Sequence, residues 1–389
     1  MVVPADWKEV KVADVIVDSF SGPSPTCLER NIQGEEWGVF KTTCSTMEQG
    51  WDYTKHKVLP RAFWGMTRSL IEVGDTVITK AGPRHRVGVA SYVNRTLDRL
   101  IVSGKMIGLR PNKTVVCPPF LALALSSKPT QEFLNQRTTG MAESQVNFEN
   151  VALLETPLYL PPLKEQEAIA EALSDADVAI ESLDALITKK RDVKEATMQQ
   201  LLTGRARLPG FTADWEEKYL GDIARVKTGS RNNQDKFADG RYPFFVRSAY
   251  VESIDSYSYD TEAILIPGEG GIGEIFHYIN GPHEVHQRVY RISDFSIDTC
   301  PKFIFFYLRS FFGSHAMRNT VKATVDSLRL PTFLEFELVI PTLKEQEAIA
   351  EALSAIDDEL EVLTEQVSKL RMVKEGMMQD LLSGKVRLV

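Results

Sequence analysis

Three short motifs in this 389-residue chain have residue types and spacings that could support chemistry, and one of them is glycine-rich. Residues 268–273, GEGGIG, fit the GxGxxG pattern of a dinucleotide site, in which the glycines open a helix whose N-terminus faces the pyrophosphate. The segment that follows, EIFHYINGP, is short and aromatic and is ended by Gly281 and Pro282. We therefore expect a glycine turn between two strands here, and no dinucleotide cofactor.

The second motif is the tetrad Cys117-Pro118-Pro119-Phe120. It resembles the Asn/Asp/Ser-Pro-Pro-aromatic tetrad with which amino-methyltransferases hold the target amine. A cysteine sulfur is a poor acceptor for that amine, and no glycine-rich S-adenosylmethionine loop lies upstream of it. The two prolines are more typical of the start of a helix.

The third motif is the HxxH spacing of His283 and His286. Because Pro282 precedes it, we expect a polar turn rather than a helix that displays both imidazoles on one face, and no metal site. The sequence also contains no phosphate-binding GxxxxGK[ST] loop. We therefore expect a chain that is not an enzyme and that holds no metal or cofactor of its own.

Length and composition indicate a folded chain of several domains. With 389 residues, 43% of them apolar, it is long enough for two or more cores. No run of eighteen apolar residues occurs and the N-terminus lacks a signal pattern, so we expect a cytoplasmic protein without a membrane span. The four cysteines lie far apart without a CxxC spacing, which argues against disulfides and structural zinc.

An internal duplication is the strongest feature of the sequence. Residues 161–208 align without a gap onto residues 341–388 at a constant offset of 180, with 28 of 48 positions identical. A shorter echo, Asp-Trp-x-Glu, begins at Asp6 and again at Asp214. We therefore expect two globular parts that alternate with two copies of one unit.

Each copy of this unit is predicted to be one long helix. Prolines stand at its start, the next forty residues contain none, and Gly204 and Gly384 supply a stop. Because two similar units close most simply about a two-fold axis, we expect the helices to pair antiparallel, with the globular parts at opposite ends. Apolar residues step by three and four, as in a coiled-coil seam, at Ile169, Leu173, Ile180, Leu183 and Ile187 and at Ile349, Leu353, Ile356, Leu360, Leu363, Val367 and Leu370.

The other segments are predicted to be mainly β, because β-branched and aromatic runs such as 75–79 and 263–266 alternate with Gly, Pro and Asn turns. The expected fold class is α+β, a tandem duplicated unit with two mainly-β globular domains separated by an antiparallel pair of coiled-coil helices. The expected boundaries are 1–160 for the first globular domain, 161–208 for the first helix, 209–340 for the second globular domain and 341–389 for the second helix.

Charge, taken segment by segment, points to a nucleic acid. The formal net charge is -8, yet residues 80–113 carry eight basic residues against Asp98 alone. A second basic stretch starts at residue 225 and is interleaved with the amides Asn232, Asn233 and Gln234, which could contact base edges. Any single basic residue could equally well lie on a solvent-exposed strand face or contact DNA. The two clusters taken together favour DNA contact. The candidate DNA-binding residues are Lys80, Arg84, Arg86, Arg95, Arg99, Lys105, Arg110, Lys113, Arg225, Lys227, Arg231, Asn232, Asn233, Lys236 and Arg247.

These residues resemble a known family. A globular part that ends in an apolar strand is followed by P-x-L-K-E-Q-E-A-I-A and by a long helix closing in K-E-x-x-M-Q-x-L-L-x-G-x-x-R-L, and the whole arrangement is duplicated. This is similar to the specificity subunit of type I restriction-modification systems. The resemblance covers the whole chain, is specific at 163–208, at 343–388 and in ILIPGEGGIG, and is loose across the fronts of the globular parts.

The resemblance implies that 1–160 and 209–340 are target recognition domains, each of which reads one half of a split sequence in double-stranded DNA. The helices would fix the unread spacer between the halves. Two modification subunits, which bind S-adenosylmethionine and methylate adenine, would be partners, and through them the restriction subunits that translocate and cut. Because two dissimilar readers related by a dyad contact different half-sites, the target is expected to be asymmetric and bipartite.

Two other functions remain open on the residues alone. The first is a two-headed, sequence-specific DNA-binding protein whose coiled coil is a spacer with no link to methylation. The second is a methyltransferase with an unusual site around Cys117. Association with S-adenosylmethionine-dependent methyltransferase chains would favour the specificity subunit, and the absence of such partners would favour the two-headed DNA-binding protein. Methyl transfer by the pure chain would favour the methyltransferase.

Overall fold

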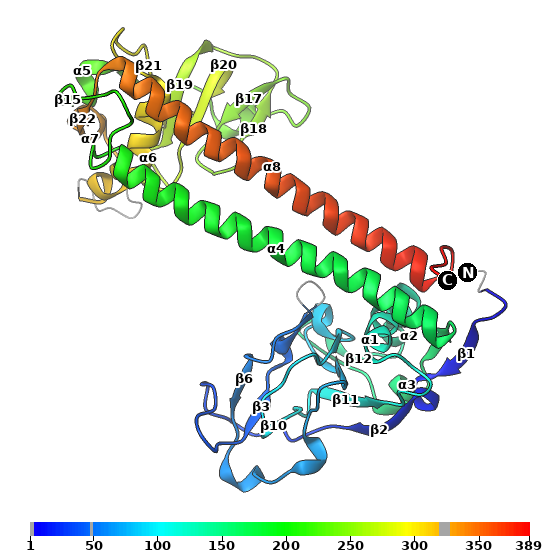
Figure 1. Ribbon diagram of the computed structural model, residues 1–389. Coiled ribbons are helices and arrows are strands. Elements are labelled where there is room, and N and C mark those ends of the chain that lie inside the picture. The colour runs from blue at the N-terminus through cyan, green and yellow to red at the C-terminus, as the bar shows by residue number, and fades with distance from the viewer. Residues whose placement is uncertain (1–3, 47–49, 319–326) are drawn as a thin grey trace. The chain divides into compact units, whose positions relative to one another are not determined.

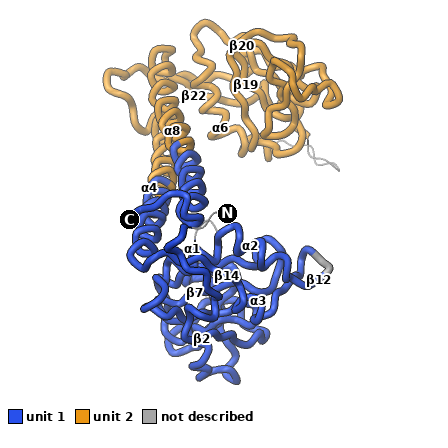
Figure 2. The backbone as a smooth tube through the Cα atoms, turned by 90° about the vertical axis from the view of Figure 1, so that its right-hand side faces the viewer, with its two compact units in different colours: residues 1–183, 366–389 blue, residues 184–365 orange. Residues whose placement is uncertain are grey.

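The computed structural model describes residues 4–46, 50–318 and 327–389. The chain divides into two compact units, residues 1–183 with 366–389 and residues 184–365 (Figure 2). Each unit therefore combines one globular part with the beginning of the long helix that follows it and with the end of the other long helix.

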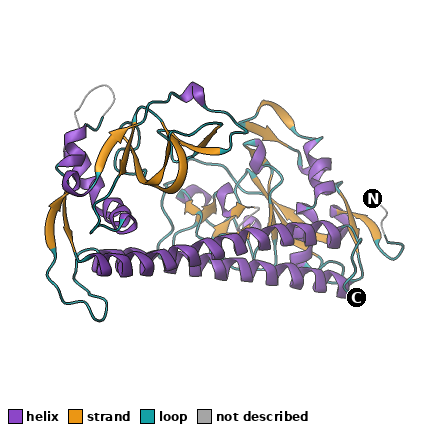
Figure 3. Ribbon diagram, turned by 90° about the horizontal axis from the view of Figure 1, so that it is seen from above, coloured by secondary structure: helices purple, strands orange, loops and turns teal. Residues whose placement is uncertain are grey.

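The globular part of the first unit is mainly strand and loop, as predicted (Figure 3). Its largest sheet is antiparallel with the order β2-β11-β7-β9, and a second sheet has the order β10-β3-β6. The strands are β1 (Lys8–Lys11), β2 (Ile16–Phe20), β3 (Gly38–Phe40), β4 (Ser45–Thr46), β5 (Gly50–Trp51), β6 (His56–Val58), β7 (Thr76–Thr79), β8 (Ala81–Gly82), β9 (Ala90–Tyr92), β10 (Leu100–Ile101), β11 (Met106–Pro111), β12 (Thr139–Ala142), β13 (Gln145–Asn147) and β14 (Pro157–Leu160). The helices are α1 (Pro118–Ser126), α2 (Lys128–Asn135), α3 (Asn150–Leu154) and the 3-10 helices η1 (Val12–Val15), η2 (Thr42–Cys44), η3 (Arg61–Phe63), η4 (Thr67–Ser69) and η5 (Arg84–Arg86).

The globular part of the second unit is built on one six-stranded sheet with the order β16-β21-β19-β20-β17-β18. All its neighbouring strands are antiparallel except β17 and β20, which are parallel. The strands are β15 (Glu216–Tyr219), β16 (Arg225–Thr228), β17 (Tyr242–Phe245), β18 (Glu252–Ile254), β19 (Tyr259–Pro267), β20 (His277–Val285), β21 (Val289–Ser293) and β22 (Glu337–Ile340). The helices are α5 (Leu220–Ile223), η6 (Asn233–Asp235), α6 (Pro301–Arg318) and α7 (Leu330–Leu334).

The two duplicated segments form the long helices α4 (Leu163–Leu201) and α8 (Leu343–Leu382), as predicted (Figure 1). Gly204 and Gly384 follow their ends with positive φ angles of 67° and 70°, which only glycine adopts without strain. In both units the strand before the long helix pairs antiparallel with the first strand of the globular part, β14 with β1 and β22 with β15.

Within each unit the two long helices run antiparallel. In the first unit the core joins Ile169 and Leu173 near the start of α4 to Leu381 at the end of α8. In the second unit it joins Leu353 near the start of α8 to Leu201 at the end of α4. Every residue of the predicted coiled-coil seam is buried or half-buried, as expected for apolar residues at a 3-4 spacing. A fully buried Leu or Ile contributes about 1.5–3 kcal/mol through the hydrophobic effect.

Buried carboxylates fix the ends of the helices. Glu165, in the first turn of α4, is fully buried. It accepts a hydrogen bond of 2.7 Å from Nη2 of Arg387, a residue that lies beyond the end of α8. Arg207, beyond the end of α4, binds the buried Glu345 of α8 through Nη2, also at 2.7 Å. Each unit therefore contains the same clasp between the start of one helix and the end of the other.

The tryptophans of the Asp-Trp-x-Glu echo pack against these clasps. The Trp7 ring lies 6.0 Å from the Arg387 guanidinium carbon, and the Trp215 ring lies 5.6 Å from that of Arg207. Asp6 also accepts a hydrogen bond from Arg387 Nη2, at 2.6 Å. The duplicated tryptophan thus has the same structural role in both units, and the Asp6 hydrogen bond adds to the clasp of the first unit.

Two glutamines join the helices to the globular parts. Gln166 Oε1 accepts the N–H of Cys117 at 2.9 Å, where α1 begins, and Gln166 Nε2 donates to the Pro161 carbonyl at 2.9 Å. Gln346 does the same with the N–H of Cys300, at the start of α6, and with the carbonyl of Pro341. The Cys-Pro segments therefore begin helices, as predicted for Cys117.

We expect Gln166→Ala to lower the free energy of unfolding of the first unit by about 1–3 kcal/mol, because it leaves the N–H of Cys117 and the Pro161 carbonyl without a partner. The control is Gln379→Ala, at an exposed position of α8, which should change stability by no more than about 0.5 kcal/mol. Urea unfolding of the full chain measures both. Equal effects of the two substitutions would contradict the structural role of Gln166.

Candidate nucleic-acid interface

The glycine-rich motif forms the turn between β19 and β20, as predicted. Glycine is required at position 268, because a Cβ there would lie 2.9 Å from the Tyr290 ring, and Gly270 has a φ angle of 71°. The Gly268 carbonyl accepts the N–H of Leu328 at 2.8 Å. The turn therefore holds Glu269 at a fixed position.

The histidine motif differs from its prediction. The expected polar turn was wrong, because strand β20 runs through Pro282 and His283, and the His283 and His286 side chains are buried. Among residues 4–46, 50–318 and 327–389, no group of three or more His, Cys, Asp or Glu side chains could hold a metal ion. Burial also raises the pKa of the Cys117 thiol, which opposes its ionisation.

Arg231 anchors the loop that follows β16 in the second unit. Its Nε lies 3.3 Å from Oε2 of Glu284, whose side chain is fully buried, and Ser258 Oγ donates to the same oxygen at 2.6 Å. The Arg231 carbonyl accepts the N–H of Gln287 at 2.8 Å. Arg231, a predicted DNA contact, therefore holds the loop on the sheet, and its side chain remains 38% exposed.

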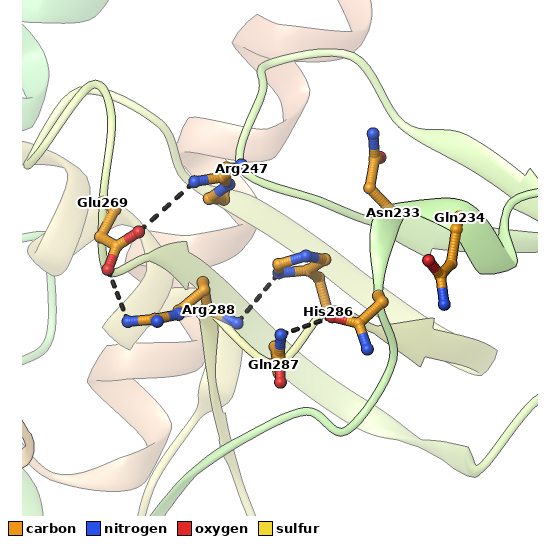
Figure 4. Close-up of a pocket in the computed structure, with 8 residues that line it drawn as sticks. Asn233, Gln234, Arg247, Glu269, His286, Gln287 and Arg288 are labelled. Carbon is orange, nitrogen blue, oxygen red and sulfur yellow. Dashed lines mark hydrogen bonds and ion pairs between the residues drawn. The ribbon is translucent and has the colours of Figure 1, made fainter.

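The same loop continues into η6, which carries a row of amide side chains. Asn232 precedes η6, and its N–H donates to Asp235 Oδ2 at 2.8 Å. The Asn232 side-chain oxygen accepts a hydrogen bond from Gln287 Nε2. The next two residues, Asn233 and Gln234, are exposed and project from η6 (Figure 4).

A hollow of about 340 Å³ opens beside η6. In Figure 4 Asn233 and Gln234 lie on one side of it and Arg247, Glu269 and Arg288 on the other. Glu269 accepts hydrogen bonds from Arg288 Nη1 at 2.7 Å and from Arg247 Nη1 at 3.4 Å. Because two guanidinium groups share one carboxylate, this side of the hollow keeps a net positive charge.

His286 and Gln287 lie between these two sides (Figure 4). Burial, followed by the charges of Arg247 and Arg288, lowers the pKa of His286. Its Nδ1 accepts the N–H of Arg288 at 3.0 Å, which requires that nitrogen to be unprotonated. The imidazole is therefore neutral at pH 7.

The other predicted contacts of the second unit lie outside the hollow. Arg225 and Lys227 are exposed on β16, and Arg225 Nη1 lies 3.8 Å from Asp294. Lys236 is exposed and lies 3.1 Å from Glu252. Such surface ion pairs contribute little to stability, so these cations can exchange partners.

In the first unit the structure separates the predicted basic cluster into two kinds of residue. Arg86 Nη2 donates to the carbonyl oxygens of Thr42 at 2.7 Å and Ser45 at 3.1 Å. Arg110 Nε lies 3.1 Å from the buried carboxylate of Asp75. These two guanidinium groups are engaged inside the fold, where strand pairing brings their partners from other segments.

The remaining basic residues of this cluster lie at the surface. Arg84 pairs with Glu143 at 3.0 Å, and that carboxylate is 78% exposed. The Lys80 side chain donates a hydrogen bond to Asn150, and the Arg95 guanidinium lies over the ring of Tyr53. Arg99 forms an ion pair with Glu35, and Lys105 and Lys113 are exposed. The backbone N–H of Lys80 donates to the Lys105 carbonyl at 2.9 Å, so these two residues, distant in sequence, are neighbours.

Sequence reasoning missed four residues of the hollow: Glu269, His286, Gln287 and Arg288. Two of them carry a signal, because Glu269 lies in the glycine-rich motif and His286 in the HxxH motif, but these motifs indicate a dinucleotide site and a metal site rather than DNA contact. Gln287 and Arg288 follow His286 directly and belong to no motif.

Comparisons with known proteins give one consistent result. Residues 4–189 and 212–370 match the family model of the type I restriction modification DNA specificity domain. The type I restriction enzyme MjaVIII specificity subunit of Methanocaldococcus jannaschii is 25% identical over an alignment of 423 residues that covers 99% of this chain and 94% of that protein. The type I restriction enzyme EcoEI specificity subunit of Escherichia coli is 30% identical over 176 residues, which cover 44% of this chain and only 29% of that protein.

A solved structure has the same fold. The type I restriction-modification S subunit from M. genitalium superposes with a TM-score of 0.66 at 16% identity, over 97% of this chain and 96% of that one. In the described part of the chain, no helix is both long and apolar enough to cross a membrane. The two family matches cover most of the chain, one on each globular part, so the chain belongs to the type I restriction modification DNA specificity family, and DNA sequence specificity is its function.

Proposed function

We propose that this chain reads an asymmetric, bipartite target in double-stranded DNA and recruits two modification subunits, through which restriction subunits join. The observation that carries the proposal is that two specificity domains of unlike sequence each match the family and are each followed by a copy of one duplicated helix, identical at 28 of 48 positions. The chain itself would be non-catalytic, and S-adenosylmethionine would bind to the modification subunits.

Different surfaces of the two domains support an asymmetric target. The second domain has amides, arginines and one carboxylate around a hollow, whereas the first has exposed lysines and arginines on loops and strand ends. Amides and arginines contact base edges, while lysines mainly contact phosphates as point charges. Two surfaces with such different donors and acceptors suit two different half-sites.

The charge of the second domain supports a role for partner subunits. Residues 214–340 carry 14 basic and 18 acidic residues, a net charge of -4. A net negative charge repels the DNA phosphates, and contacts with these phosphates supply much of the affinity in protein–DNA binding. We infer that the modification subunits provide part of the backbone contact on this half.

A pull-down from the native host tests the proposal. Stoichiometric recovery of S-adenosylmethionine-dependent methyltransferase chains, followed by sequencing of the sites they methylate, should give one asymmetric bipartite sequence. Sequence-selective DNA binding without such partners would instead support a two-headed DNA-binding protein with a coiled-coil spacer.

The isolated chain should neither bind S-adenosylmethionine nor methylate or cleave DNA, because its glycine-rich motif forms a turn between two strands and its Cys-Pro-Pro-Phe motif starts a helix rather than a cofactor loop. Calorimetry with the purified chain checks the first point, and incubation with labelled cofactor and DNA checks the second. Saturable cofactor binding would refute the division of labour between this chain and its partners.

Replacing Arg84 should weaken contact with the half-site of the first domain. Its ion pair with Glu143 is exposed, so the guanidinium can transfer to DNA at little cost. We expect Arg84→Ala to cost about 1–3 kcal/mol of binding if Arg84 makes a bidentate base contact and less if it contacts a phosphate.

The comparison variant is Arg110→Ala, which should lower stability instead, because it leaves the buried carboxylate of Asp75 without its cation. Binding titrations and thermal unfolding separate the two effects. Unchanged affinity and an unchanged methylated motif for Arg84→Ala would remove this arginine from the interface.

Lengthening the paired helices should change the spacer and leave both half-sites intact. Four residues inserted in each helix, after Leu183 and after Glu365, add about 6 Å of helix, close to two base pairs of DNA rise. The control is the same insertion after Gly210, in an exposed segment outside both helices. New recognised bases at an unchanged spacing would count against the helices as a ruler.

A further inference from the structure

We propose that the hollow beside η6 is the base-reading site of the second specificity domain, in which Asn233 and Gln234 read an adenine and Arg247 and Arg288 read a guanine in the major groove. The proposal rests on the proposed function and adds to it the residues that read and the bases they select.

The amide side of the hollow suits adenine. An amide offers a donor and an acceptor side by side, which is the pattern that pairs with adenine N7 and N6 in the major groove. Asn233 and Gln234 are adjacent on η6, exposed, and placed on the same side of the hollow (Figure 4). An amide can only donate to a phosphate oxygen, whereas an adenine edge uses both its donor and its acceptor, so these side chains suit a base edge better than a phosphate.

The arginine side suits guanine. A guanidinium donates two parallel hydrogen bonds to guanine O6 and N7, the commonest specific contact in the major groove. The side chains of Arg247 and Arg288 are 53% and 59% exposed, so both can reach outward from the hollow. Glu269 holds them both through its two carboxylate oxygens, which limits the directions in which they can point.

Glu269 also distinguishes a base from a phosphate. A phosphate presents only acceptors, and a carboxylate 18% exposed at the edge of the hollow repels it. A base pair presents donors as well as acceptors, and the amino group of cytosine, paired with the guanine, can donate to such a carboxylate. The mixture of amides, cations and one anion therefore matches a base-pair edge better than it matches the DNA backbone.

Hydrogen bonds and an ion pair fix the segments that line the hollow. The buried Glu284 carboxylate fixes Arg231 at the start of the loop, and Gln287 bonds the side chain of Asn232. The neutral imidazole of His286 receives the N–H of Arg288. Because the main chain of the site is fixed before DNA arrives, little order has to be gained on binding, as sequence discrimination requires.

The test uses the full chain assembled with its modification subunits on DNA of random sequence, with sequencing of the methylated sites. The double variant Asn233→Ala/Gln234→Ala should lose selection at an adenine position, and Arg247→Ala or Arg288→Ala at a guanine position of the same half-site. The expected loss of discrimination is roughly five- to 150-fold at each position. The other half-site should not change.

Matched controls are Asn280→Ala and Arg241→Ala, exposed residues of the same domain outside the hollow, which should leave the motif intact. An unchanged motif in the hollow variants, or equal weakening on all sequences, would overturn the base-reading site. A wild-type complex that assembles but methylates no defined sequence would instead overturn the proposed function, so the two failures are distinguishable.

A separate variant tests the role of Glu269. Glu269→Gln keeps the size of the side chain but leaves two cations without their shared anion. Binding to non-cognate DNA should then become tighter and more salt-dependent, with a log–log salt slope steeper by about one, while selection at the guanine position weakens. Wild-type selectivity and an unchanged salt slope would show that Glu269 does not restrain the arginines.

Discussion

The pairing of a buried carboxylate at the start of each long helix with an arginine beyond the end of the other organises both units. A buried charge is costly unless it is paired and hydrogen-bonded, and the side chains of Glu165 and Glu345 are both buried. Their partners, Arg387 and Arg207, lie far away in the sequence. Neither helix can therefore bury its start without the end of the other, which requires the antiparallel arrangement seen within each unit.

The same requirement accounts for two further pairs of identical positions in the helical copies. Lys374 pairs with Asp177 in the first unit, and Lys194 pairs with Asp357 in the second, at positions related by the offset of 180. Each unit needs the same contacts, so both copies carry the same side chains there. The recognition surfaces have no such reciprocal constraint. Their side chains can differ between the domains as long as the buried groups beneath them remain paired.

The candidate site was only partly predictable from the sequence. Basic residues interleaved with amides drew attention to Asn233 and Arg247, and both line the hollow. Glu269 and Arg288 were missed as parts of one site, because sheet pairing brings their segments together and no local pattern encodes that pairing. In the first domain, likewise, the run of basic residues could not show that Arg110 faces the buried Asp75, since the contact depends on the pairing of β7 with β11.

The sequence by itself determined the long helices, their apolar seam and their ends, because these depend on spacings of three and four residues and on the local conformations of proline and glycine. It also determined the duplication and, through the resemblance, the family. The tertiary structure decided which polar side chains are engaged inside the fold and which remain exposed at the surface. Arg86 and Arg84 are two residues apart, yet one donates to backbone carbonyl groups inside the domain and the other lies at the surface. That difference arises from long-range packing, which places a partner beside one side chain and solvent beside the other.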